Sequence, residues 1–315
     1  MKSGSRCRLP ACAGLLLVLA VGCAHGGGTG PAGQRTIEQI DVVPAFLSAW
    51  EEVRSAPRAE QLARTRQALL ATHPELFGPE VLGPGATLDR DLERLLVEMP
   101  RLEPKLRALS DRMHGEVERG ARRFLDDFPE LAWSGPVASS LSFSQFEAVW
   151  RNVGGRRTLV LGLDAIAFYR GPYAPMEPVI HHALARALLP VWKGPGPVPL
   201  WWTLWEEAFP LAAVRTLDPG ASDADLRLME EGKDPASLAA LARRVRAVLD
   251  STRESDRRVV TGTGAATASG GRWLALRVGQ GILAGRTLHD AARLEGPVLR
   301  SAIEAALLAL ERPGS

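Results

Sequence analysis

Apolar runs of strand length are confined to one part of the sequence, residues 137–163, and this restriction decides the fold class. There, two apolar segments flank a Gly-Gly pair, a pattern typical of strands joined by a turn, and a segment of helical type begins near Asp164. On both sides apolar residues recur every three or four positions, as in helices that bury one face. The pattern predicts an α+β fold that is predominantly helical, with a small β-sheet near a histidine-bearing helix.

Helical periodicity begins near residue 37 and returns after Pro178. In the first flank, prolines are expected to divide the chain into several helices at Pro74, Pro79, Pro84, Pro100 and Pro104. In the second flank, we expect helices over residues 179–189, 200–217, 221–232 and 237–254. Pro210 is expected to kink the second of these. An apolar content of 46% is enough for a substantial core, and we expect residues 37–312 to form a single domain.

The first 22 residues have the features of a lipoprotein signal peptide. Three basic residues precede an apolar run of about a dozen residues, which is too short to span a bilayer. The run ends in LAVGC, which resembles the lipobox before the acylated cysteine of bacterial lipoproteins. We therefore expect residues 1–22 to be removed, Cys23 to carry the lipid, and the Gly-rich residues 23–36 to form a flexible tether. An ordinary signal peptide with an incidental cysteine is the alternative.

Cysteine usage and charge exclude several classes of function. Cys7 and Cys12 lie in the signal and Cys23 would carry lipid, so the mature domain has no thiol for disulfides or catalysis. Removal of the signal leaves 35 Lys and Arg against 36 Asp and Glu, so no basic field is left to bind nucleic acid. Ala24 after the cysteine is similar to the outer-membrane sorting pattern. We expect a lipid-anchored protein of the cell envelope, at the outer membrane and facing the periplasm.

A glycine pattern near the C-terminus has to be weighed as a dinucleotide site. Gly262, Gly264 and Ala266 form a GxGxxA arrangement. The dinucleotide fingerprint needs a buried strand before it and a helix after it. Only Val259 and Val260 precede these glycines, directly after the charged run RESDRR. The sequence therefore predicts a mobile loop here.

The stretch VIHHALARAL, residues 179–188, is partly similar to helices that bind catalytic zinc. Such a helix directs His at i and i+4 toward one metal ion, with Glu at i+1 as general base, and a later helix supplies a third ligand. In this register His181 is the first ligand and Glu207 the third. His182 stands in the general-base position, and Ala185, which has no donor atom, stands in the second ligand position. Taken alone, a His-His pair on an apolar helix is more typical of a hydrogen-bonded core feature.

Four segments, in order along the mature chain, carry a resemblance to a known family. They are IDVVPAFLSAWEEV, GGRRTLVLGLDAIAFY, LWEEAFPLAAVRTLDPGASDADLRLM and RTLHDAARLEGPVLRSAIEAALLAL. The third, for example, is similar to the family pattern LWEEGLAxYVSxxLNPGASDxxL. Together the segments resemble a family of bacterial predicted zinc-dependent proteases that includes gliding-motility-type lipoproteins.

The resemblance implies a zincin-like fold, in which the metal helix and the Glu helix pack beneath a small sheet and an extended substrate adds to the sheet edge. It implies that His181 and Glu207 are remnant metal ligands. The general base, the second ligand and an oxyanion-stabilising tyrosine are replaced by His182, Ala185 and Trp273. Peptide hydrolysis requires a barrier lowered by well over ~10 kcal/mol, which metal-bound hydroxide, base and oxyanion donors supply together. We therefore expect a catalytically degenerate homologue with no catalytic residue and no cofactor.

Three functions remain open on the sequence. The first is a degenerate zincin-like lipoprotein that binds a protein or peptide partner. The second is an active zinc-dependent metallohydrolase with a non-standard ligand set, which recruits Glu206, His182 or His114. The third is a helical structural lipoprotein of unrelated fold. The first function predicts much less than one zinc ion per chain, and it predicts that His181→Ala changes stability little.

Overall fold

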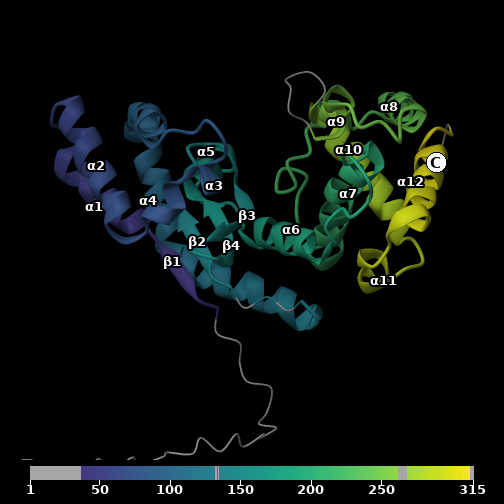
Figure 1. The fold of residues 1–315 in the computed structure, drawn as a ribbon, viewed down its shortest axis with the longest axis horizontal. Helices are drawn as coiled ribbons and strands as arrows, with labels where there is room; N and C mark the ends of the chain where they lie inside the picture. The colour runs from purple at the N-terminus through teal and green to yellow at the C-terminus, as the bar shows by residue number, and fades with distance from the viewer. Residues whose placement is uncertain (1–36, 132, 134, 262–267, 313–315) are drawn as a thin grey trace, which may run out of the picture. The chain divides into compact units, whose positions relative to one another are not determined.

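The computed structural model describes residues 37–131, 133, 135–261 and 268–312, which belong to one compact unit (Figure 1). The unit is α+β and mostly helical, so the predicted fold class is confirmed at this level. The strands are β1 (Gln39–Asp41), β2 (Val137–Ser140), β3 (Ala148–Val153) and β4 (Arg156–Gly162). The α-helices are α1 (Val43–Val53), α2 (Arg58–Thr72), α3 (Pro79–Leu82), α4 (Leu88–Asp127), α5 (Leu163–Tyr169), α6 (Glu177–Leu188), α7 (Leu200–Leu217), α8 (Pro235–Ala247), α9 (Glu254–Thr261), α10 (Ala268–Leu283), α11 (Leu288–Ala292) and α12 (Gly296–Leu310). The short 3₁₀ helices are η1 (Pro74–Phe77) and η2 (Glu230–Gly232).

The sheet has the strand order β1-β2-β4-β3. β1 and β4 each pair with β2 in parallel, and β3 pairs with β4 in antiparallel orientation. The turn between β3 and β4 needs two residues with positive φ, and Gly154 and Gly155 supply them at 55° and 80°. Three strands thus come from the predicted stretch. β1, which lies just before α1, was not predicted, and its three residues are too few to give an alternating pattern.

Helix α4 corrects the prediction that every proline ends a helix. It runs unbroken for 40 residues, with Pro100 and Pro104 inside it. Both prolines lie on the exposed face, where water can bond the carbonyl groups that lose an N–H partner. The opposite face buries residues at helical spacing from Leu92 to Phe124. Tertiary packing along this face outweighs the local cost of the two prolines.

Helix α6 lies between the sheet and the C-terminal helices (Figure 1), and it contacts α4, β3 and α7. Pro178 lies in its first turn, where a missing N–H costs no helical hydrogen bond. Helix α7 follows Pro199 and spans the predicted residues 200–217, with Pro210 inside. Nearly every residue in its first four turns is buried, because α6, α9 and α10 pack around it. The two helices that carry the predicted site residues are therefore adjacent.

The helix predicted over residues 221–232 is wrong. Only η2 is helical there, and the preceding residues form turns. Ser222 and Asp225 bond each other as in a capping box that begins a helix, since Asp225 accepts from the Ser222 backbone nitrogen at 2.8 Å and its own nitrogen donates to the Ser222 hydroxyl at 3.1 Å. Arg227 then has a φ of 54°, outside the right-handed helical region, so the helix does not continue. The apolar residues of this segment are spaced for a helix, but they are held by a loop.

Several predicted features lie outside the described residues. They are the signal segment, Cys23, the tether, and the pattern formed by Gly262, Gly264 and Ala266. Among the helices that are described, none combines the length and the apolar character needed to cross a membrane.

Candidate functional site

His181 is fully buried and lies in a polar cluster between three helices. Its Nδ1 is 2.6 Å from Oδ2 of Asp218, which follows α7, and its Nε2 is 3.0 Å from the carbonyl oxygen of Gly120 on α4. The other oxygen of Asp218 is 3.1 Å from a guanidinium nitrogen of Arg123. The Gly120 carbonyl can only accept, so Nε2 of His181 donates a proton to it. The ring therefore joins α6, α4 and the end of α7.

This environment differs from that of a metal ligand. A ligating imidazole offers the lone pair of one nitrogen to the metal and donates from the other. Both nitrogens of His181 already have protein partners, so metal binding would break the bond to Gly120 or to Asp218. Ala185, one turn further along α6, is fully buried and has no donor atom. His181 is therefore a hydrogen-bonded core residue, which is the alternative to a metal ligand that a His-His pair on an apolar helix suggests.

Glu207, the predicted third ligand, is paired with two arginines. One carboxylate oxygen is 3.5 Å from a guanidinium nitrogen of Arg186 on α6, and the other is 3.5 Å from one of Arg272 on α10. The Glu207 side chain is only 13% exposed, so water screens these ion pairs weakly. Each oxygen of the carboxylate thus faces a fixed positive charge.

The face of α6 that points toward Glu207 carries His182 and Arg186. Residues four apart share a helix face, whereas adjacent residues point about 100° apart. Arg186 contacts Glu207, while His181 contacts α4 on the other side of the helix. The pair that faces α7 is therefore one residue later than the expected pair of His181 and Ala185. In this register His182 stands at the first ligand position and an arginine stands at the second.

The replacement ligands considered from the sequence are not brought together. Glu206 is 4.0 Å from Arg186, and burial raises the pKa of its carboxyl group. His114 is exposed on α4, and its carbonyl oxygen accepts a hydrogen bond from Gln39 beside the sheet. Within the described part of the chain, no three His, Cys, Asp or Glu residues form a group that could hold a metal ion.

A polar cavity of about 120 Å³ lies beside His182, where α6, the start of β3, the loop after α7 and α10 meet. Its polar and charged lining residues are Glu147, Arg170, His182, Asp225, Arg227 and Arg272. His182 is half-buried, but its Nε2 atom is buried and has no hydrogen-bond partner in the structure. Burial lowers the pKa of His182 well below its ordinary value, and the charges of Arg272, Arg186 and Arg170 lower it further. The ring is therefore neutral at pH 7.

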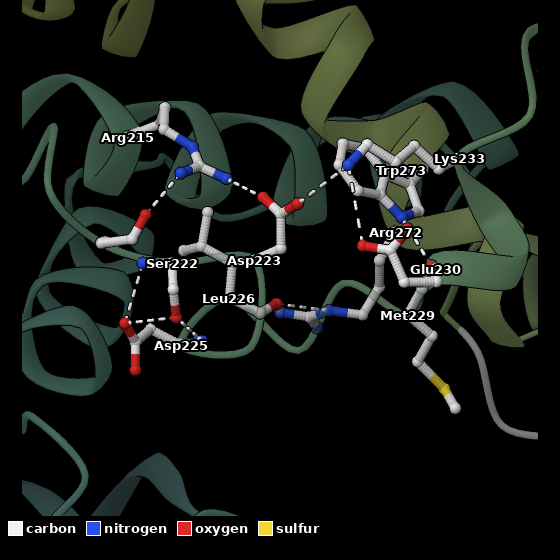
Figure 2. A network of polar contacts seen from close by, with 11 residues as sticks. Arg215, Ser222, Asp223, Asp225, Leu226, Met229, Glu230, Lys233, Arg272 and Trp273 are labelled. Atoms are coloured by element: carbon white, nitrogen blue, oxygen red, sulfur yellow. Dashed lines mark hydrogen bonds and ion pairs between the residues drawn. The ribbon is translucent and has the colours of Figure 1, made fainter.

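The loop between α7 and α8 forms one wall of this cavity, and polar contacts hold it in place (Figure 2). Arg215 at the end of α7 is 2.6 Å from the carboxylate of Asp223. On α10, Arg272 donates to the carbonyl oxygen of Leu226 at 3.0 Å, and Trp273 donates to that of Met229 at 2.8 Å (Figure 2). Trp273, which stands at the tyrosine position of the resembled family, thus fixes the loop through its indole nitrogen.

Most charged residues of the cavity were missed from the sequence. Among the residues of its lining, only His182 was singled out from the sequence. Arg170, Arg227 and Arg272 lie on three separate elements, and no local pattern marks them as a group. Only the packing of α10 and the loop against α6 brings them to one cavity.

Comparisons of the chain with protein families, with curated proteins and with solved structures find no match. The fold is a mostly helical α+β unit with a four-stranded sheet. The likeness to zinc-dependent proteases stands on the four sequence segments alone.

Proposed function

We propose that the chain is a lipid-anchored protein of the bacterial cell envelope with a zincin-like arrangement of its two site helices. It uses the cleft beside α6, the polar cavity lined by α6, the start of β3, the loop after α7 and α10, to bind a ligand or partner and does not hydrolyse peptide bonds. The observation that carries the proposal is the pairing of Glu207 with Arg186 and Arg272 at 3.5 Å each. Where α6, α7 and α10 meet, two guanidinium groups pair with the carboxylate that the resemblance assigns to a metal.

The electrostatics of the cleft support a binding role. Zinc in a catalytic site is held by three protein ligands that carry lone pairs or negative charge. Here the face of α6 toward Glu207 offers one neutral histidine, His182, and one cation, Arg186. Two positive charges near the buried Glu207 would repel a divalent cation in a region of low screening. The chemistry of the donor set therefore fits an anion better than a metal ion.

Metal analysis tests this proposal directly. The protein purified with its lipid in detergent, after dialysis against zinc and then against metal-free buffer, is expected to retain much less than one zinc ion per chain. Arg186→His should retain more zinc than Arg186→Gln, because only the first variant adds a second imidazole to His182 and Glu207 on the facing helices. Stoichiometric zinc in the unaltered protein would overturn the proposal. Equal zinc in the two variants would show that residue 186 does not lie on the face of α6 that carries His182 and points toward Glu207.

The anchor is tested separately, at a residue outside the described part of the chain. Mass spectrometry of the N-terminus of the mature protein is expected to find a lipid-modified Cys23. Cys23→Ala should leave an unprocessed or soluble protein, because the covalently attached lipid supplies the membrane affinity. An unmodified N-terminus at another residue would contradict the lipoprotein assignment.

A further inference from the structure

The cavity beside His182 has more positive than negative groups in its walls. Its lining includes three guanidinium groups, those of Arg170, Arg227 and Arg272, and two carboxylates, those of Glu147 and Asp225. Burial lowers the pKa of the Arg272 guanidinium, the charge of Glu207 opposes this shift, and the charges of Arg227 and Arg170 lower the pKa further. The three arginines thus lie close enough to repel one another. Such a cluster is stabilised when an anion binds between its members.

Three of the four carboxylate oxygens in the walls have protein partners. The two oxygens of Glu147 accept from Arg170 at 2.9 and 2.8 Å. The Oδ2 atom of Asp225 accepts from the backbone and hydroxyl of Ser222, within the loop itself. Arg227 has only a 3.8 Å contact with Glu147 and a position 4.9 Å from the ring centre of Tyr169. Its guanidinium therefore keeps donors that these contacts do not use.

The backbone around Arg227 is fixed in an unusual conformation. Arg227 has a φ of 54°, in the left-handed region that non-glycine residues seldom adopt. The carbonyl groups of the two preceding residues, Asp225 and Leu226, accept hydrogen bonds from Arg170 and Arg272. Two arginines that line the cavity thereby hold the loop that presents the third.

His182 also lines this cavity. Its buried Nε2 has no partner among the described residues, and a buried nitrogen without a hydrogen bond is costly. The cavity volume of about 120 Å³ exceeds the roughly 10–15 Å³ that a single water molecule needs. A small group with several oxygen atoms has room there, beside the histidine and the arginines.

We infer that this cavity is a binding site for a small oxyanion, a phosphate or carboxylate group, with His182, Arg227 and Arg272 as its donors. The inference rests on the proposed function, since it names the ligand chemistry of the same cleft. Neutral His182 contributes one N–H, and Arg227 contributes a charged fork at the exposed rim. Arg272 forms the floor, where it is held by Leu226 and Glu207.

Isothermal titration of the detergent-purified protein with sodium phosphate, and separately with sodium acetate, tests the inference in a buffer of low chloride content. Saturable binding of at least one anion is expected, and the two arms distinguish a phosphate from a carboxylate ligand. Arg227→Met should weaken that binding about tenfold or more, because it removes a charge-assisted hydrogen bond. Arg227→Lys should restore part of the affinity.

The control is Arg244→Met, which removes the same charge from an exposed position on α8 outside the cavity lining and should leave the affinity unchanged. His182→Phe supplies a second variant that removes the buried nitrogen and keeps a ring. Absence of saturable binding in the unaltered protein, or equal weakening by Arg227→Met and Arg244→Met, would overturn the inference. A protein that is free of zinc but binds neither anion would refute this site and leave the proposed non-hydrolytic function standing.

Discussion

Replacing His181 with alanine is expected to lower the free energy of unfolding by about 3–5 kcal/mol. The substitution leaves a cavity in the core and removes both ring nitrogens. Asp218 then loses its 2.6 Å partner while it stays largely buried, and the Gly120 carbonyl loses its donor. Guanidinium chloride denaturation followed by tryptophan fluorescence measures the change. A remnant metal ligand would tolerate alanine, so this expectation reverses the one drawn from the sequence.

The matched control is His73→Ala. The His73 ring is 3.0 Å from Glu75, only two residues along the chain, and its side chain is 33% exposed. An exposed pair of this kind contributes about 0–1 kcal/mol, so the control should unfold at nearly the same denaturant concentration as the unaltered protein. A cycle with Asp218→Asn should give a coupling energy of about 1–3 kcal/mol with His181→Ala. Equal stability of the two alanine variants would contradict the buried cluster.

The elements predicted best from the sequence are those with a local physical signal. Residues 200–217 were predicted as a helix and form α7, and the apolar runs on both sides of Gly154 and Gly155 form β3 and β4. Where a prediction was wrong, a contact within or beyond the element outweighed the local signal. Helix α4 continues through Pro100 and Pro104 because its long apolar face is packed along its length. Residues 221–232 leave the helical conformation at Arg227, which has a φ of 54°.

The site was harder to predict, because a step of one residue changes which side chain faces a cleft. His181 and His182 are adjacent, and about 100° of helix rotation separates the contact with α4 from the cavity that α10 and the loop after α7 line. That rotation is fixed by how α6 packs against its neighbours, which no local pattern reports. Glu207 was predicted as the third metal ligand, whereas its partners in the structure, Arg186 and Arg272, come from two other helices.

Replacing Gly279 with valine is expected to destabilise the protein by about 3 kcal/mol or more, because it forces apart the closest helix pair around the site. Helices α7 and α10 cross where Gly279 faces Ala208 and Ala212. A Cβ atom on Gly279 would lie 2.4 Å from the Ala208 carbonyl oxygen and 2.8 Å from the Ala212 Cβ. A backbone atom cannot move aside as a flexible side chain can, so the whole of α10 must shift.

Gly281→Ala is the control, two residues further along the same helix. Its added Cβ would meet Ala306 at 3.5 Å, an ordinary contact, and alanine favours a helix over glycine by about 1 kcal/mol. Chemical denaturation should therefore show unchanged or higher stability for Gly281→Ala, intermediate loss for Gly279→Ala and the largest loss for Gly279→Val. Since α10 carries Arg272 and α7 carries Glu207, the valine variant should also weaken anion binding at the cavity. Wild-type stability of Gly279→Val would show that the two helices do not cross this closely in solution.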